Sequence, residues 1–385
     1  MSLKLSQRHR WVLQSEIRNM SIECDKVGGI NLSQGVCNLE VPPVVKEEAQ
    51  KAIDAGRNAY TRYDGIQEIR EAVAKKLNRL YGIDADPERE IVVTSGSTGA
   101  FYCAALGLLD PGDEVILFEP YYGYHLSTLQ ATGAKATYVT LDFPDLSFGM
   151  EDLKQALSPR TKGIMVCTPS NPSGKVFSKD EIELIGRFAL ENDLFIFTDE
   201  IYEHFVYDGA KHLPPGSLEH LSDHVITISG QSKTFSITGW RIGYCHCSPK
   251  WSQTIGYFHD LVYVCAPAPL QVGVAHGLME LEESYYESLL QAFVNKRELI
   301  CSTLDRAGFS PKVPEGGYYV MADISKLPGK TSKEKAMYLL ETTGVACVPG
   351  EAFYHKPEDG TDIARFCFAK SDQELQEACE RIGNL

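Results

Sequence analysis

The sequence predicts an α/β fold in which a mainly parallel seven-stranded sheet is sandwiched by helices and joined to a smaller α+β domain. Between residues 91 and 247, seven short apolar runs alternate with helical stretches, as in parallel sheets covered on both faces. After about residue 285 the pattern changes to one long helix followed by short strands. A chain of 385 residues is also too long for one small core.

The predicted elements follow from periodicity and from breaker residues. An irregular segment at 30–43 precedes amphipathic helices at 44–55 and 66–80. The seven predicted strands span residues 91–94, 115–118, 136–141, 163–167, 194–198, 225–229 and 242–247. Helices fit between most of them, such as the one at 179–191, which opens with Ser178 and Glu181 at capping-box spacing.

The C-terminal part is expected to form a smaller domain. One long helix at 285–308 and short strands at 317–322, 345–348 and 363–369 would make only a thin core by themselves. We therefore expect the N-terminal residues to complete it. This predicts a large domain at 45–280 and a small domain made of 1–44 and 281–385.

Composition excludes several classes of function. The net charge is −15 and no basic run offsets it, so we expect no nucleic-acid partner. The eleven cysteines form no Cys-x-x-Cys pair and no zinc-type cluster, which indicates reduced thiols, a cytoplasmic location and no bound metal. Residues 1–19 lack a secretory apolar core, and the uncharged run at 261–279 contains two prolines, so no membrane segment is expected.

The segment at 229–244 follows the sixth predicted strand and offers a distinctive set of groups. It contains a lysine amine, Lys233, flanked by hydroxyls and glycines, with Arg241 eight positions on. An amine can form a Schiff base, small residues let a bulky ligand approach, and a fixed cation suits a phosphate. Pyridoxal 5′-phosphate is the cofactor that needs all three, although the segment alone also fits a turn with two solvated cations.

Other predicted strands end in groups that suit the same cofactor. Glycines and hydroxyls at 95–100 open a helix and could bind a phosphate or serve as caps. The aromatic residues at 120–124 could stack on a ring or simply pack, and Asn171 lies in a turn. Asp199 ends an apolar run, where a protonated ring nitrogen would satisfy it, unless it caps a helix. Because such strand ends meet at one sheet edge, we expect one crevice there.

Three motifs give this chain a specific resemblance. They are Asn171-Pro172-Ser173-Gly174, Asp199-Glu200-Ile201-Tyr202 and Ser232-Lys233-Thr234-Phe235 with Thr238-Gly239-Trp240-Arg241-Ile242-Gly243. In this order the chain resembles the fold-type I pyridoxal-phosphate-dependent aminotransferases, the class I/II family of the aspartate aminotransferase superfamily, over about residues 31–369. There are two departures: Gly230 stands where many relatives have a serine, and the loop at 35–38 reads Gly-Val-Cys-Asn where relatives often have Gly-x-Pro-Asp.

The resemblance implies a role for each site residue. Lys233 would carry the cofactor as a Schiff base and move the substrate Cα proton, Asp199 would pair with the pyridine nitrogen, and Tyr202 with the ring hydroxyl oxygen. The resemblance also implies that Asn171 contacts that oxygen and the substrate, and that Tyr122 stacks on the ring. At the phosphate it implies Ser97, Thr98, Ser232, Arg241 and the other subunit's Tyr60, with Ser229 as an alternative to the missing serine. At the substrate α-carboxylate it implies Gly35 and Arg365.

The resemblance also implies the reaction. An aminotransferase would move the amino group of an L-amino acid to a 2-oxo acid in a ping-pong cycle between pyridoxal and pyridoxamine phosphate, as a homodimer with active sites at the interface. The alternative enzyme is a β-C–S lyase on cystathionine-like substrates, and a regulatory module fused to a DNA-binding head is disfavoured by the acidic chain. Arg62, Lys4 and Arg10 are candidates for a distal carboxylate, while Tyr121, Tyr122, Tyr124 and Phe353 would suit an aromatic or large apolar side chain.

Overall fold

A seven-stranded sheet forms the centre of the structure, a computed structural model that describes residues 3–11, 14–37, 39–141 and 145–385. In order across the sheet the strands are β2 (Ile91–Thr94), β8 (Gly243–His246), β7 (Val225–Gly230), β6 (Phe195–Asp199), β5 (Thr161–Cys167), β3 (Glu114–Glu119) and β4 (Lys135–Thr140). Only β8 runs antiparallel to its neighbours. The predicted fold class is confirmed, and every predicted strand of this sheet is present within three residues at either end.

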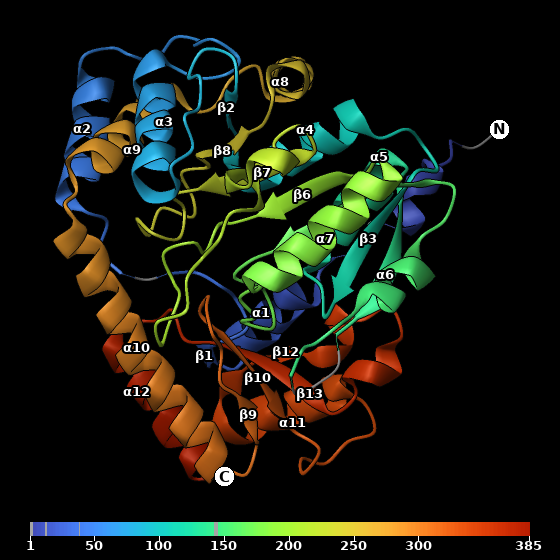
Figure 1. Ribbon diagram of the computed structural model, residues 1–385. Coiled ribbons are helices and arrows are strands. Elements are labelled where there is room, and N and C mark those ends of the chain that lie inside the picture. The colour runs from blue at the N-terminus through green and yellow to red at the C-terminus, as the bar shows by residue number, and fades with distance from the viewer. Residues whose placement is uncertain (1–2, 12–13, 38, 142–144) are drawn as a thin grey trace.

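Helices cover both faces of this sheet (Figure 1). One face packs against α4 (Gly96–Leu108), α5 (Gly123–Thr132) and α8 (Pro249–Tyr263). The other face packs against α6 (Met150–Ala156) and α7 (Lys179–Asn192), and at its β2 end against α2 (Pro43–Asp54), α3 (Gln67–Tyr81) and α9 (Ala268–Glu280). Alternation along β3 serves both layers, because Val115 and Leu117 enter one core and Ile116 and Phe118 the other.

A second core lies beside the large sheet, in the lower part of Figure 1. It contains a four-stranded sheet with the order β12 (Val348–Pro349), β13 (Ile363–Cys367), β10 (Tyr319–Asp323) and β9 (Pro311–Lys312). It also contains a two-stranded sheet in which β1 (Ile30–Asn31) pairs with β11 (Val345–Ala346). Its helices are α1 (Glu16–Lys26), α10 (Glu283–Arg306), α11 (Ser332–Thr343) and α12 (Asp372–Gly383). Met20 and Cys24 of α1 enter this core, so N-terminal residues do contribute to it, while α1, α11 and α12 were not predicted individually.

Short 3-10 helices complete the described elements: η1 (Gln7–Arg10), η2 (Pro215–Ser217), η3 (Glu219–Leu221), η4 (Gly350–Phe353) and η5 (Pro357–Gly360). Among the described residues, none of the helices is both long and apolar enough to cross a membrane. The same residues contain no group of three His, Cys, Asp or Glu side chains placed to hold a metal ion. All eleven cysteines are free thiols.

The sheet brings five strand ends to one edge, as predicted. Strands β2, β3, β5, β6 and β7 all point their carboxyl ends the same way, because β2 and β7 are each antiparallel to β8.

Close packing at this edge of the sheet explains why the chain has Gly230 where many relatives have a serine. A Cβ at Gly230 would lie 2.8 Å from the Cα of Gly243 and 3.3 Å from Ser97 Oγ, so a serine has no room there.

Candidate active site

A cavity of about 560 Å³ opens at this carboxyl edge of the sheet. Eleven of the twelve site residues that the sequence predicts line it: Gly35, Ser97, Thr98, Tyr122, Asn171, Asp199, Tyr202, Ser232, Lys233, Arg241 and Arg365. Tyr60 does not line it, and its side chain is 85 % exposed. Ser229 is not brought to the cavity either, since its buried hydroxyl donates to Glu203 Oε1 at 2.9 Å, so it does not replace the missing serine.

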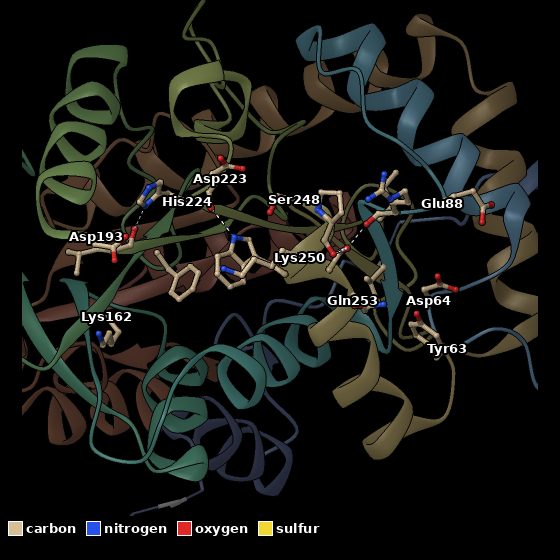
Figure 2. A pocket seen from close by; sticks show the side chains of 18 residues that line it. Tyr63, Asp64, Glu88, Lys162, Asp193, Asp223, His224, Ser248, Lys250 and Gln253 are labelled. Carbon is tan, nitrogen blue, oxygen red and sulfur yellow. Dashed lines mark hydrogen bonds between the residues drawn. The ribbon is translucent and has the colours of Figure 1, made fainter.

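A larger hollow of about 950 Å³ lies at the opposite, amino edge of the sheet. Figure 2 shows its lining, which includes Asp193, Asp223 and Lys250 and contains none of the predicted site residues. Polar groups around it are already bonded to backbone carbonyls, since Trp251 Nε1 donates to Asp223 O at 2.8 Å and His224 Nδ1 donates to Leu194 O at 2.9 Å. Size alone therefore favours the larger hollow, whereas the convergence of strand ends favours the smaller cavity as the candidate site.

Lys233 presents its amine at the floor of the smaller cavity. Nζ donates a hydrogen bond to the carbonyl oxygen of Gly35 at 3.3 Å. Burial, helped by the nearby Arg241, lowers the pKa of this amine to about 8, while Cys367 and Asp199 oppose the change. A lysine with a lowered pKa is a nucleophile and a base near neutral pH, which is unusual for an ordinary surface lysine.

Asp199 is held on the same floor as an oriented carboxylate. It is buried at the end of β6, with Oδ2 accepting from His125 Nε2 at 2.9 Å and Oδ1 accepting from the amide of Ile201 at 3.3 Å. The sequence did not single out His125, which lies in the first turn of α5 only three residues after Tyr122. Two donors fix the carboxylate and leave it facing a cationic partner in the cavity.

Arg365 is a buried cation without a counterion among the described residues. Its guanidinium donates to Asn171 Oδ1 at 2.8 Å and to the carbonyl of Ser33, and lies 4.2 Å from the centre of the Tyr319 ring. Its Nε has no partner, and no carboxylate of the described residues forms an ion pair with it. A buried charge without a counterion is costly, so the site favours an anionic ligand.

A second anion-binding feature lies at the N-terminus of α4. The guanidinium of Arg241 rests against Gly96, where a Cβ would lie 2.3 Å from Nη2. Arg241 forms no ion pair within the described chain, and Ser97 and Thr98 of the first turn of α4 line the cavity beside it. Nη1 of Arg241 donates to the carbonyl oxygen of Thr238 at 3.0 Å. A guanidinium without a described counterion beside a helix N-terminus can bind a phosphate. Phosphate, amine and carboxylate sites in one cavity fit pyridoxal 5′-phosphate.

Comparison with known proteins agrees with this geometry. The family model described as "Aminotransferase class I and II" matches residues 27–382. The chain belongs to the class I and II aminotransferases. It is 33% identical to a probable N-succinyldiaminopimelate aminotransferase of Mycobacterium tuberculosis over 95% of this chain and 94% of that protein. It is also 33% identical to an aspartate aminotransferase of Pyrococcus abyssi over 100% of this chain and 98% of that protein.

Solved structures give the same result. The N-succinyldiaminopimelate aminotransferase structure from Mycobacterium tuberculosis superposes with a TM-score of 0.95 at 33% identity, covering 99% of this chain and 100% of that chain. Enzymes of this class and fold use pyridoxal 5′-phosphate, so the predicted family, cofactor and transaminase activity are confirmed. These relatives are aminotransferases, and nothing in them points to a C–S lyase.

The lowered pKa of Lys233 predicts how the cofactor-free aminotransferase reacts with aldehydes. Only the neutral amine attacks, so the rate of reaction with pyridoxal phosphate should rise with pH and level off above about 8, where most of the amine is neutral. Stopped-flow absorbance between pH 6.5 and 10.5, with Lys233→Ala as the blank, measures this. A midpoint near pH 10, as for a solvated lysine, would contradict the burial of this amine.

Gly35 is required because the hydroxyl of Tyr319 approaches it closely. A Cβ at Gly35 would lie 1.8 Å from Tyr319 Oη, and Tyr319 is itself fixed by the hydroxyl of Tyr202 at 3.1 Å. We expect Gly35→Ala to cost about 1–3 kcal/mol of stability and to raise the KM for amino acids, because Tyr319 must move from Arg365. Thermal unfolding and steady-state kinetics measure both effects. Gly123→Ala, where a Cβ meets nothing within 4 Å, is the control, and equal melting temperatures for the two variants would refute the close contact.

The structure adds contacts in and beside the candidate site that the sequence analysis did not predict. The rings of Tyr318 and Tyr319 pack against the ring of Tyr202, with centroids 5.0 and 5.8 Å away. The two tyrosines follow directly after Gly316-Gly317, and this Gly-Gly-Tyr-Tyr sequence is a signal that could have pointed to them. Tyr122 stacks on Tyr124 at 5.3 Å. In the loop at 35–38, Cys37 Sγ lies 3.2 Å from Ser236 Oγ, and Asn38 lies outside the described residues.

Proposed function

We propose that this cavity is where the aminotransferase binds its cofactor and both substrates, an L-amino acid and a 2-oxo acid. The single observation that supports this most strongly is the set of charges there: the amine of Lys233, the oriented carboxylate of Asp199 and two guanidinium groups without carboxylate partners in the described chain. Each charge matches one group of the cofactor or substrate. Asp199 suits the ring nitrogen, Arg241 the phosphate and Arg365 the substrate α-carboxylate.

We assign the remaining contacts from the same cavity. Ser97, Thr98 and Ser232 would complete the phosphate site next to Arg241, and Tyr122 would lie against the ring. Tyr202 is buried, and burial holds its pKa well above the usual tyrosine value, so it stays a neutral hydroxyl that can donate to an oxygen of the ring. Asn171 already accepts from Arg365 and leaves its amide hydrogens for the cofactor or the substrate.

The chain's own residues can perform the proton transfer. When bound, the cofactor supplies a sink for the electron pair released at the substrate Cα. Lys233 is the only lysine among the described residues lining the cavity, and with a pKa of about 8 its Nζ can take up and return the Cα proton near neutral pH. Arg365 orients the substrate through its planar guanidinium, and the negative charge of Asp199 favours the protonated form of the ring nitrogen.

A homodimer with shared active sites is our proposal for the assembly. Tyr60 is exposed to solvent and does not line the cavity of its own chain. Five apolar side chains in the second half of α8 and at its C-cap are also exposed: Tyr257, Leu261, Val262, Tyr263 and Val264. Such surface is covered in stable assemblies. If Tyr60 reaches the phosphate of a partner subunit, Tyr60→Phe should weaken cofactor binding while leaving the dimer intact, as measured by equilibrium dialysis and sedimentation.

We further infer a division into a large domain at 45–280 and a small domain made of 1–44 and 281–385. The core that unites Met20, Cys24, Ile30 and Leu32 with residues from 289 to 382 supports it. The cytoplasmic location also stays a proposal, and it rests on eleven free thiols.

Spectroscopy of a single turnover tests the proposed function. The pyridoxal form of the enzyme is mixed with each L-amino acid in turn, and conversion to the pyridoxamine form is followed by absorbance. At least one amino acid should convert the enzyme stoichiometrically and release its 2-oxo acid, and adding a 2-oxo acid should reverse the change. A panel in which nothing converts, or in which a thioether amino acid releases pyruvate and ammonia without an added oxo acid, would overturn the proposal.

A further inference from the structure

The charged side chains that line the cavity do not balance. Arg18, Lys233, Arg241 and Arg365 are cationic, whereas Asp199 is the one carboxylate among the described lining residues. In the proposed function Lys233 carries the cofactor, Arg241 meets its phosphate, and Arg365 meets the substrate α-carboxylate. Arg18 is left without a partner in the cofactor or in the common part of the substrate.

We propose that Arg18 binds a carboxylate at the far end of the substrate side chain, so that the enzyme selects amino acids and 2-oxo acids with two carboxylates. This rests on the proposed function, because it takes Arg365 as the site of the α-carboxylate. Arg18 and Arg365 line the same cavity, so one substrate could meet a guanidinium group at each end. Arginine suits this role because its planar fork matches a carboxylate.

The surroundings of Arg18 leave its guanidinium free. Arg18 lies in the first turn of α1, and its nearest acidic neighbour in the helix, Glu16, is already bonded by Lys333 Nζ at 2.6 Å and by Asn19 Nδ2 at 2.8 Å. Arg18 has no ion pair with any carboxylate that the structure describes. Ile17 packs beside Met321 and Phe353, which anchors this turn of α1 next to Arg365.

A stabilising role does not explain Arg18. It occupies the third position of α1, where the positive end of the helix dipole makes a cation unfavourable and where a capping box would place Glu or Gln. The hydroxyl of Ser15 accepts a hydrogen bond from the backbone amide of Arg18 at 3.4 Å, and the side chain of Arg18 takes no part in this cap. Arg18 is exposed, weakens the helix slightly and forms no ion pair with a described carboxylate, which fits a residue that contacts a ligand at the cavity.

The other basic candidates from the sequence are less suitable. Arg62 is bound by Asp64 and by Glu88, both at 2.7 Å, and does not line the cavity. Lys4 and Arg10 also lie outside the cavity lining. Tyr122 and Tyr124 do line it and would suit an aromatic side chain, so preference for a neutral aromatic substrate is the competing outcome of the test.

Binding of unreactive acids tests Arg18 without any catalytic step. The holoenzyme is titrated with succinate, glutarate and adipate, and with monocarboxylates of the same chain lengths, by isothermal titration calorimetry. At least one dicarboxylate should bind about 10- to 100-fold more tightly than its monocarboxylate, the range for charge-assisted hydrogen bonds. Arg18→Gln should remove that difference and Arg18→Lys should retain part of it. Arg187→Gln, an exposed arginine of α7, is the matched control and should leave it unchanged.

Kinetics separate failure of this inference from failure of the proposed function. The ratio of kcat/KM for an acidic amino acid to that for its amide, measured for glutamate against glutamine and aspartate against asparagine, should fall about 10- to 100-fold in Arg18→Gln. An unchanged ratio, or a wild type that prefers the amide or an aromatic amino acid, would overturn the role of Arg18 while transamination stands. Absence of transamination with every amino acid would instead refute the proposed function.

Discussion

Lys233→Ala is expected to abolish transamination. Because Lys233 is the one described lysine in the cavity, its loss removes both the anchoring amine and the base at the substrate Cα, and kcat should fall on the order of 10⁴-fold or more. Steady-state assays with the best amino acid from the panel measure this. Circular dichroism should show an unchanged fold, since among the described residues Nζ forms a single hydrogen bond, a long one of 3.3 Å to the carbonyl of Gly35.

The matched control is Lys250→Ala. Lys250 lies in the larger hollow at the amino edge of the sheet, over the ring of Trp251 at 4.2 Å (Figure 2). Activity of this variant should equal that of the wild type. Loss of activity in Lys250→Ala, or activity within tenfold of the wild type in Lys233→Ala, would place the chemistry in the wrong cavity.

Asp199→Asn should produce the second large effect. The change keeps the shape of the side chain but removes the negative charge that we propose pairs with the ring nitrogen, and His125 would then face an amide. We expect kcat to fall on the order of 10²- to 10³-fold, as when one preorganised electrostatic group is lost. Single-turnover rates with one amino acid measure the effect on the chemical step directly.

Asp193→Asn is the control for this change. Asp193 ends α7 in the left-handed conformation, which asparagine also adopts readily, and it lines the larger hollow. This variant should keep wild-type rates. A rate for Asp199→Asn within a factor of three of the wild type would show that the carboxylate does not influence the ring.

The sequence predicts the large sheet well because its strands are buried on both faces. Each strand is a short apolar run between breakers, such as the run that becomes β3, where Val115 and Ile116 serve opposite cores. The candidate site follows from the same pattern, since Asp199 is the last residue of β6 and Lys233 lies in the turn just beyond the end of β7, and parallel strands fix which edge they share.

The rest depends on contacts between segments far apart in the chain. The strands β1 and β11 have two residues each, too few for any periodic signal, yet their pairing brings Ile30 beside Val345 and carries α1 with Arg18 to the cavity. The role of Tyr319 depends on the pairing of β10 with β13, and that of His125 on the packing of α5 against the sheet. The charge of Arg62 looks free in the sequence, whereas folding pairs it with Asp64 and Glu88.

Reductive trapping tests the central claim most directly. The holoenzyme is reduced with borohydride, digested and analysed by mass spectrometry for the lysine that carries the reduced cofactor. We predict one modified site, Lys233, with the modification lost from Lys233→Ala and kept in Lys250→Ala. Attachment at any other lysine of the wild-type enzyme, or an adduct that persists in Lys233→Ala, would contradict the assignment of this cavity as the active site.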